Sequence, residues 1–196
     1  VEVPGCGWTT VKAPSLVGGH EARAFAGVID GGAFLENDLL RVEFNHNGEI
    51  TRLMDKESGR EQLKGLGNQL RMYKDVPDIW DAWDLNSMTE DAPVELEDNG
   101  RLEVFWSGPL VAKLRLTRKL HNSEMAQVIS LKRSSRRIEF ETGIDWQESH
   151  KLLKVNFPTN IHADEAVHEV QFGHLRRPNH KSRPYDADRF EVSAHK

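Results

Sequence analysis

Residues 40–59 read LRVEFNHNGEITRLMDKESG, and this stretch decides the fold class. From Leu40 to Phe44, apolar residues alternate with charged ones, as they do in a strand that buries one face and exposes the other. Asn47-Gly48 follows, and this pair favours a tight turn because both residues tolerate a positive φ. A second strand-forming run extends from Ile50 to Met54. The stretch therefore predicts a β-hairpin.

The same alternation recurs along the chain, and no long segment has a helical repeat. In the longest case, Leu110, Ala112, Leu114 and Leu116 face one way and alternate with polar residues on the other face. Alternation of this kind is typical of antiparallel sheets with one buried face. We predict an all-β chain that forms an antiparallel β-sandwich, with an N-terminal strand and linker at 1–28 and a partial sandwich domain at 29–196. Further predicted strands lie at 138–146 and at 102–106, where Leu102, Val104 and Trp106 are expected to share the buried face.

Composition excludes several classes of protein. The 196 residues can bury a sizeable core without disulfides, and the single cysteine, Cys6, excludes an internal disulfide. The net charge of -5 argues against nucleic acid as a partner. There is no apolar run long enough to cross a membrane, and the first residues do not resemble a signal peptide. A reduced thiol without a leader favours the cytoplasm.

Two tryptophans and two aspartates stand close together in a polar stretch, Trp80-Asp81-Ala82-Trp83-Asp84. If these residues form a helical turn, Asp81 and Asp84 share a face and could act as a carboxylate pair, as in retaining glycosidases. Trp80 and Trp83 could stack on sugar rings. Alternatively, the indoles pack under a loop while the carboxylates cap it or face water.

A second candidate lies in the polar stretch from Arg176 to Asp188, which has the composition of a long loop. Arg177 and His180 in this stretch could bind an anion or glycan hydroxyls, or simply face water. Five histidines from His150 to His180 fall at intervals of six, but the spacing matches no metal motif. The basic run Lys132–Arg137 is predicted to be a charged hairpin turn.

Several motifs resemble family 38 of the glycoside hydrolases, the α-mannosidases. They occur in order over nearly the whole chain: Val3–Trp8, Leu35–Val42, Gly48–Glu61, Gly67–Leu70, Trp80–Asp84, Asp145–Val155, Gln171–His180 and Arg189–Lys196. Where relatives place a further Trp, this chain has Lys181–Asp186, so a sugar contact there would fall to Tyr185.

The resemblance implies that this chain is the first part of the β-region, a supersandwich similar to galactose mutarotase that is incomplete at its C-terminus. The aspartate nucleophile and the zinc ligands are expected in an upstream catalytic domain. No catalytic or metal-binding residue is therefore assigned here, and no cofactor is expected in this chain. The expected partners are the upstream catalytic and helical domains and an α-mannoside, and exposed sheet edges would favour a homo-oligomer.

Within the resemblance, the leading hypothesis is a non-catalytic β-sandwich of a zinc-dependent retaining α-mannosidase that packs on the catalytic domain and shapes its site. The side chains expected nearest the substrate are Trp80, Asp81, Trp83, Asp84, Arg177 and His180. Two other hypotheses stay open. The chain could be a carbohydrate-binding module that uses Trp80 and Trp83, or a structural spacer that binds no ligand.

Overall fold

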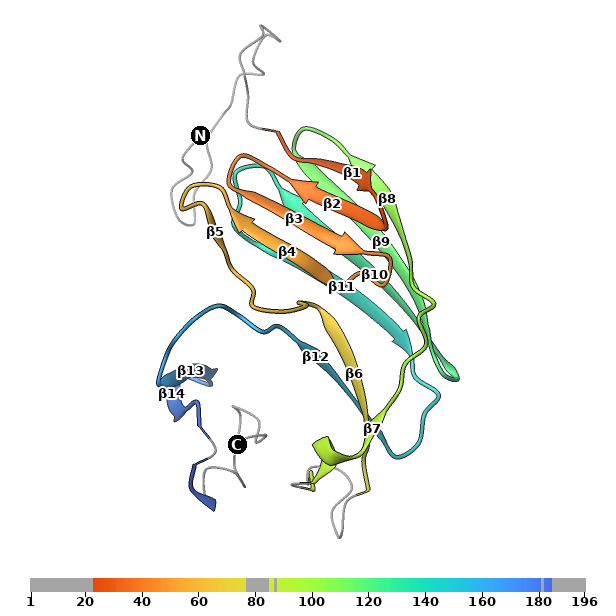
Figure 1. Ribbon diagram of the computed structural model, residues 1–196, viewed down its shortest axis with the longest axis vertical. Coiled ribbons are helices and arrows are strands. Elements are labelled where there is room, and N and C mark those ends of the chain that lie inside the picture. The colour runs from red at the N-terminus through yellow and green to blue at the C-terminus, as the bar shows by residue number, and fades with distance from the viewer. Residues whose placement is uncertain (1–22, 77–84, 87, 181, 185–196) are drawn as a thin grey trace, which may run out of the picture.

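The structure is a computed structural model that describes residues 23–76, 85–86, 88–180 and 182–184 (Figure 1). Within the described residues up to 180, the only helix is the 3-10 turn η1 (Thr89–Asp91), and all sheets are antiparallel. The all-β prediction is therefore confirmed. The part that the structure describes has no helix that is long and apolar enough to cross a membrane.

The first sheet contains five strands in the order β1-β2-β3-β4-β5. The predicted hairpin forms its centre, and Gly48 in the turn has φ of +74°. The predicted boundary between residues 28 and 29 falls inside β1, so the division of the chain into these two parts stays a prediction. The strands are β1 (Phe25–Ile29), β2 (Gly32–Glu36), β3 (Leu40–Asn45), β4 (Ile50–Asp55) and β5 (Arg60–Glu61).

The second sheet contains four strands in the order β11-β10-β9-β8. Its two central strands pair over their full length, from Ser123↔Leu120 to Lys132↔Val111. The basic run lies in the turn between β10 and β11, as predicted. The strands are β8 (Arg101–Ser107), β9 (Val111–Leu120), β10 (Ser123–Lys132) and β11 (Ile138–Asp145).

The two sheets pack face to face, and this confirms the predicted β-sandwich (Figure 1). Alternate residues of β2 and β3 meet alternate residues of β9 and β10, so the period-two pattern becomes one continuous core. Burial of each large aliphatic or aromatic side chain stabilises the fold by about 1.5–3 kcal/mol. The buried residues of this core include Leu35, Val42, Phe44, Ile50, Leu114, Ile129 and Leu131.

A single buried side chain joins the two sheets at one end of the sandwich. Asn37 Oδ1 accepts hydrogen bonds from the backbone of Leu39 and Leu40, at 2.9 and 2.7 Å. Its Nδ2 donates to the carbonyl oxygens of Lys132 and Ser135, both at 2.8 Å. This asparagine closes the turn between β2 and β3 and fastens it to the turn between β10 and β11.

A smaller sheet and a separate hairpin complete the described fold (Figure 1). The three-stranded sheet packs a second core of Met72, Leu116, Leu120 and Met125 against the ends of β9 and β10. Its strands, in the order β12-β6-β7, are β6 (Gln69–Lys74), β7 (Pro93–Val94) and β12 (Lys151–Asn156). The hairpin comprises β13 (Glu165–Val170) and β14 (Gly173–Pro178).

Two expectations about local structure were wrong. The first residues of the predicted long loop at 176–188 belong to strand β14, which pairs with β13 along its whole length and places Pro178 at the strand end, where the missing N–H is tolerated. Trp106 does not share the buried face of β8, because a register shift between Val104 and Trp106 turns its ring outward and leaves it 60% exposed.

Candidate functional site

The six residues predicted to lie nearest a substrate are not brought together in the described structure. Trp80, Asp81, Trp83 and Asp84 lie outside the described residues, so their roles stay predictions. Arg177 is half-buried in β14, opposite Ala166. His180 is exposed just after β14, with its Nδ1 2.7 Å from the Ser182 hydroxyl. Neither Arg177 nor His180 lines the cavity described next.

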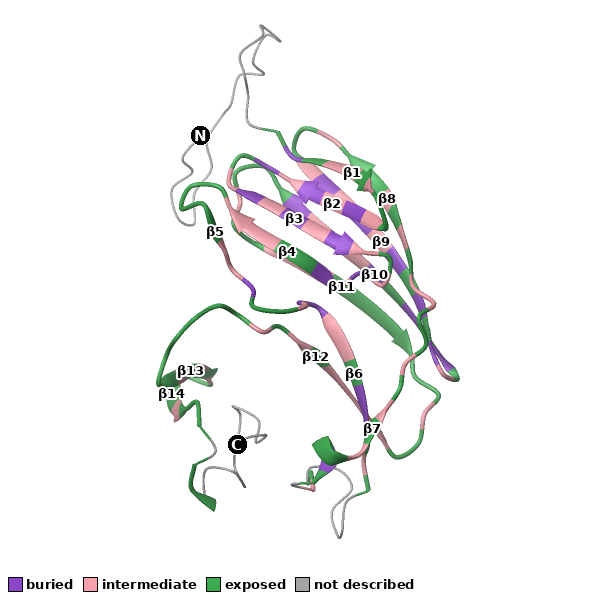
Figure 2. Cartoon of the chain, in the orientation of Figure 1, coloured by how far each residue is buried: buried purple, intermediate pink, exposed green. Residues whose placement is uncertain are grey.

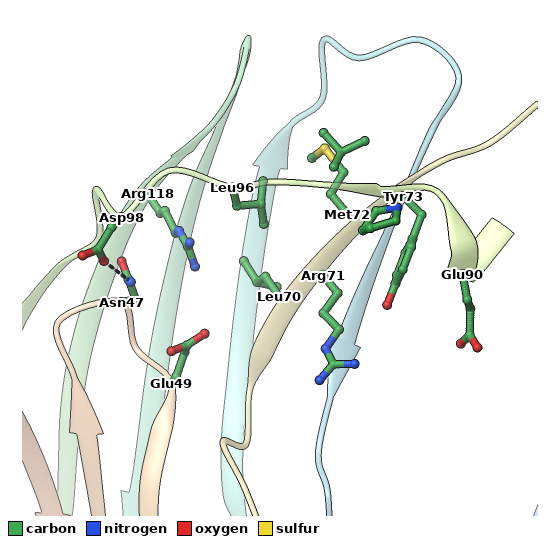
Figure 3. A pocket seen from close by; sticks show the side chains of 12 residues that line it. Asn47, Glu49, Leu70, Arg71, Met72, Tyr73, Glu90, Leu96, Asp98 and Arg118 are labelled. Atoms are coloured by element: carbon green, nitrogen blue, oxygen red, sulfur yellow. Dashed lines mark hydrogen bonds between the residues drawn. The ribbon is translucent and has the colours of Figure 1, made fainter.

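The structure instead shows a polar cavity of about 560 Å³ where the sandwich meets the smaller sheet (Figure 3). Its walls come from the β3–β4 turn, β6, β9 and the segment that leads from β7 to β8. Both charged and apolar side chains line it: Asn47, Glu49, Leu70, Arg71, Met72, Tyr73, Glu90, Pro93, Val94, Leu96, Asp98 and Arg118.

The β3–β4 turn is held rigidly at the edge of this cavity. A Cβ on Gly48 would lie 2.6 Å from Leu116 Cδ2 and would displace that side chain, and the positive φ of +74° also favours glycine at this position. The Asn68 side chain donates to the Gly48 carbonyl at 2.9 Å and to Gln127 Oε1 at 2.8 Å. On the other side, Asn47 Oδ1 accepts from the Gly100 backbone at 2.9 Å. The Asn-Gly pair that ends the first predicted strand therefore also positions cavity-lining side chains.

Arg118 is the unusual residue of the cavity. It lies on the inward face of β9, in register with Leu114 and Leu116, and only 8% of its surface is exposed. Its Nη2 donates to the Glu97 carbonyl at 3.0 Å. Its Nε and Nη1 are buried and have no hydrogen-bond partner in the described part of the chain. Burial lowers the pKa of this guanidinium, although the negative charges of Glu49 and Asp98 oppose the shift.

Two carboxylates stand near this guanidinium without forming an ion pair with it. Asp98 binds His46 Nε2 at 2.6 Å and also accepts from the Asn47 amide. These two hydrogen bonds, from His46 and then from Asn47, hold the pKa of Asp98 below its ordinary value. Glu49 accepts from Asn45 Nδ2 at 2.8 Å. Figure 3 shows Arg118 extending from β9 toward the space beside Glu49, with Leu70 and Leu96 on its other side.

The β6 side of the cavity is partly apolar. Met72 and Tyr73 are buried, and Leu70 and Leu96 pack against the second core. Arg71 Nε and Nη2 donate to Gln69 Oε1, at 3.0 and 2.9 Å. At the far end, Lys154 Nζ lies 3.4 Å from Glu90 Oε1. The cavity thus combines fixed charges with an apolar wall, which is the usual composition of a small-molecule site.

Sequence patterning missed Arg118, although a signal was present. The alternation that places Leu114 and Leu116 inward also places residue 118 inward, so a charged side chain falls on the buried face. A charged residue at such a position requires a partner or has a function. In the described structure, two donor atoms of Arg118, Nε and Nη1, have no such partner.

The described residues do not fit a metal centre. No group of three or more histidine, cysteine, aspartate or glutamate side chains in the described ranges could hold a metal ion. The five evenly spaced histidines are not gathered into such a group within those ranges. The expectation that zinc belongs to an upstream domain is not tested by this result.

Comparison with known proteins identifies the chain's family. Residues 35–196 match the family described as the glycosyl hydrolases family 38 C-terminal domain. The chain belongs to this family. The match begins inside β2 and includes every later described element of this family 38 domain.

The curated relatives of this family 38 domain are α-mannosidases. Human alpha-mannosidase 2C1 is 34% identical over 203 residues, which cover 100% of this chain and 20% of the human protein. Alpha-mannosidase G of Dictyostelium discoideum is 36% identical over 174 residues, covering 85% and 16%. A Saccharomyces cerevisiae alpha-mannosidase is 30% identical over 156 residues, covering 73% and 14%. The chain therefore spans about a fifth or less of each relative's length.

Proposed function

We propose that this chain is the non-catalytic β-sandwich portion of an enzyme that hydrolyses terminal α-mannosides. The single observation that carries the proposal is the family match over residues 35–196, together with relatives that are α-mannosidases many times longer than this chain. In the proposed enzyme, the nucleophile, the general acid and zinc belong to the preceding catalytic region. The sandwich packs on that region and shapes the mouth of its site.

The distribution of apolar side chains supports a packing role. In the β12–β14 region, residues 151–178, strand β12 is mostly half-buried, half of β13 is exposed and β14 is almost wholly exposed (Figure 2). A cytosolic or secreted domain rarely leaves many large apolar side chains in water unless another surface covers them. The exposed apolar residues of this region are Val155, Phe157, Ile161, Val167, Phe172 and Leu175.

Among the described elements, the hairpin β13–β14 makes extensive contacts only between its own two strands. Its two strands contact each other extensively, while the described parts of the two sandwich sheets pack on one another. Isolated two-stranded hairpins are only marginally stable in water. The rest of the enzyme would supply the missing surface, and Arg177 and His180 would then lie at or near the junction.

A hydrolysis assay tests the proposal. The purified chain is incubated with 4-nitrophenyl α-D-mannopyranoside, first with zinc and then with a chelator, beside a longer α-mannosidase polypeptide that contains the chain. We expect turnover only from the longer polypeptide. Chelator-sensitive turnover by the chain alone, retained after repurification, would contradict the proposal and make Asp98 and Glu49 the first residues to replace.

A matched pair of variants tests the packing role in the longer polypeptide. Val167→Asp lies in the β12–β14 region, and Val28→Asp lies on exposed β1 of the sandwich. We expect Val167→Asp to lower kcat/KM and Val28→Asp to leave it unchanged, because a buried unpaired carboxylate would disrupt only a surface that is covered. Equal activity of the two variants would contradict packing through this region.

A further inference from the structure

We propose that the cavity beneath Arg118 binds a saccharide through adjacent hydroxyl groups. This binding site would be separate from hydrolysis, because it is formed within the sandwich portion itself. It goes beyond the proposed function and can hold or fail independently of it. The site consists of Arg118, Glu49, Asn47 and Asp98, with Leu70 and Leu96 forming the apolar wall.

The buried donors of Arg118 are the first argument. The Glu97 carbonyl fixes one nitrogen at 3.0 Å, which holds the guanidinium in place. Nε and Nη1 remain buried without an acceptor in the described structure. A buried polar group without a partner is costly, and native proteins rarely leave one without a role. The side chain therefore offers a ligand preorganised donors.

The acceptors opposite these donors are the second argument. Glu49 and Asp98 line the same cavity as Arg118, on either side of the space into which it extends (Figure 3), yet neither forms an ion pair with it. Carboxylate oxygens accept hydrogen bonds and guanidinium nitrogens donate them. A hydroxyl group can do both at once, so a ligand with neighbouring hydroxyls can bridge these groups.

The charge and the volume of the cavity favour a saccharide over an anion as its ligand. Three carboxylates (Glu49, Glu90, Asp98) and two guanidinium groups (Arg71, Arg118) line the cavity, so a phosphate would meet net negative charge. The volume of about 560 Å³ falls within the range of roughly 300–1,000 Å³ that is common for ligand sites. Leu70 and Leu96 offer an apolar wall for the C–H face of a sugar ring.

The test is a titration of the isotope-labelled full chain, followed by ¹H–¹⁵N NMR. The probe is methyl α-D-mannopyranoside, and inorganic phosphate serves as the anionic comparison. We expect saturable shifts in amides next to the cavity, including Asn47 and Arg118, with the sugar and not with phosphate. No saturable shift with the sugar, or saturable shifts at these amides with phosphate alone, would overturn the proposal.

Variants assign the binding to the cavity. Arg118→Met keeps the aliphatic stem and removes the donors, and it should weaken sugar binding about tenfold or more. Glu49→Gln removes the charge of one acceptor and keeps the size of the side chain, and it should weaken binding severalfold. Arg101→Met makes the same chemical change at an exposed site on β8 and should leave the affinity unchanged.

The affinity of a variant is interpreted only if its spectrum shows a folded chain. If Arg118→Met does not fold, Glu49→Gln alone decides between the outcomes. An unchanged affinity in the folded cavity variants would overturn the proposal and leave Arg118 a purely structural role. The titration measures binding and not turnover. A negative result would therefore overturn the cavity proposal without bearing on the proposed mannosidase role.

Discussion

The two ends of the molecule treat apolar side chains in opposite ways. In the sandwich, large residues such as Phe44 are buried between two sheets and almost fully removed from water. In the β12–β14 region, residues such as Phe172 are exposed. Among the described residues, the sandwich packs a core between its own sheets, although Val28 and Trp106 on its surface are exposed. No buried core residue lies in β13 or β14. The difference separates the part of the chain that supplies stability from the part proposed to meet the catalytic region.

Replacing one phenylalanine in each region should give the largest contrast. Phe44→Ala removes a ring from the sandwich core and should lower the free energy of unfolding by about 3–5 kcal/mol. Phe172→Ala removes an exposed ring and should change it by less than about 0.5 kcal/mol. Urea denaturation of the isolated chain measures both values. Comparable losses in the two variants would erase the distinction between the regions.

Asn37 provides the next largest expected effect. Asn37→Ala removes the acceptor of the buried Leu40 N–H and the two hydrogen bonds donated to the carbonyl oxygens of Lys132 and Ser135, so the free energy of unfolding should fall by about 2–3 kcal/mol. Asn160→Ala, at an exposed position near β12, is the matched control and should change it by less than about 0.5 kcal/mol. If denaturation midpoints of the two variants coincide, Asn37 does not hold the sheets together.

Glu148 connects the two regions, and its contribution to the stability of the fold should depend on pH. The carboxylate accepts from Lys151 at the start of β12 and from Asn122 and Ser123 beside β10. The hydrogen bond from Lys151 is the main cause that lowers the pKa of Glu148 from its ordinary value of 4.5. The ionised carboxylate therefore stabilises the fold above about that pH, and this stabilisation is lost as the pH falls toward the lowered pKa.

The Glu148→Gln variant isolates this contribution. Thermal unfolding at a series of pH values should show a higher Tm for the wild-type chain than for the variant at pH 7. The two Tm values should converge in acid. Glu141→Gln, on the exposed part of β11, is the control and should follow the wild type. A constant gap between wild type and Glu148→Gln at all pH values would mean that ionisation of Glu148 does not join the regions.

The smallest effect on stability is expected at the exposed surface itself. Val167→Asp should change the free energy of unfolding of the isolated chain by less than about 0.5 kcal/mol, because the side chain is already in water. It should nevertheless reduce self-association at high concentration, measured by sedimentation velocity, since fewer apolar groups are exposed. Unaltered self-association would show that this surface does not attract other apolar surfaces.

The sequence predicted the sandwich better than the region beside it, for a physical reason. Strands β3 and β9 each bury one face, so alternation marks them. Strand β14 buries little, and its proline and basic residues have the composition of a loop. The Arg118 cavity depends on four segments distant in sequence, so only the inward position of a charged residue could have indicated it.

The most direct measurement of the central claim is hydrogen exchange, followed by mass spectrometry, in two settings. The isolated chain is compared with the same residues inside a longer α-mannosidase polypeptide. We predict slow exchange in β3, β9 and β10 in both settings, and a gain of protection in β12, β13 and β14 only in the longer polypeptide. Equal protection of β12–β14 in both settings would contradict the claim that this region is covered by the rest of the enzyme.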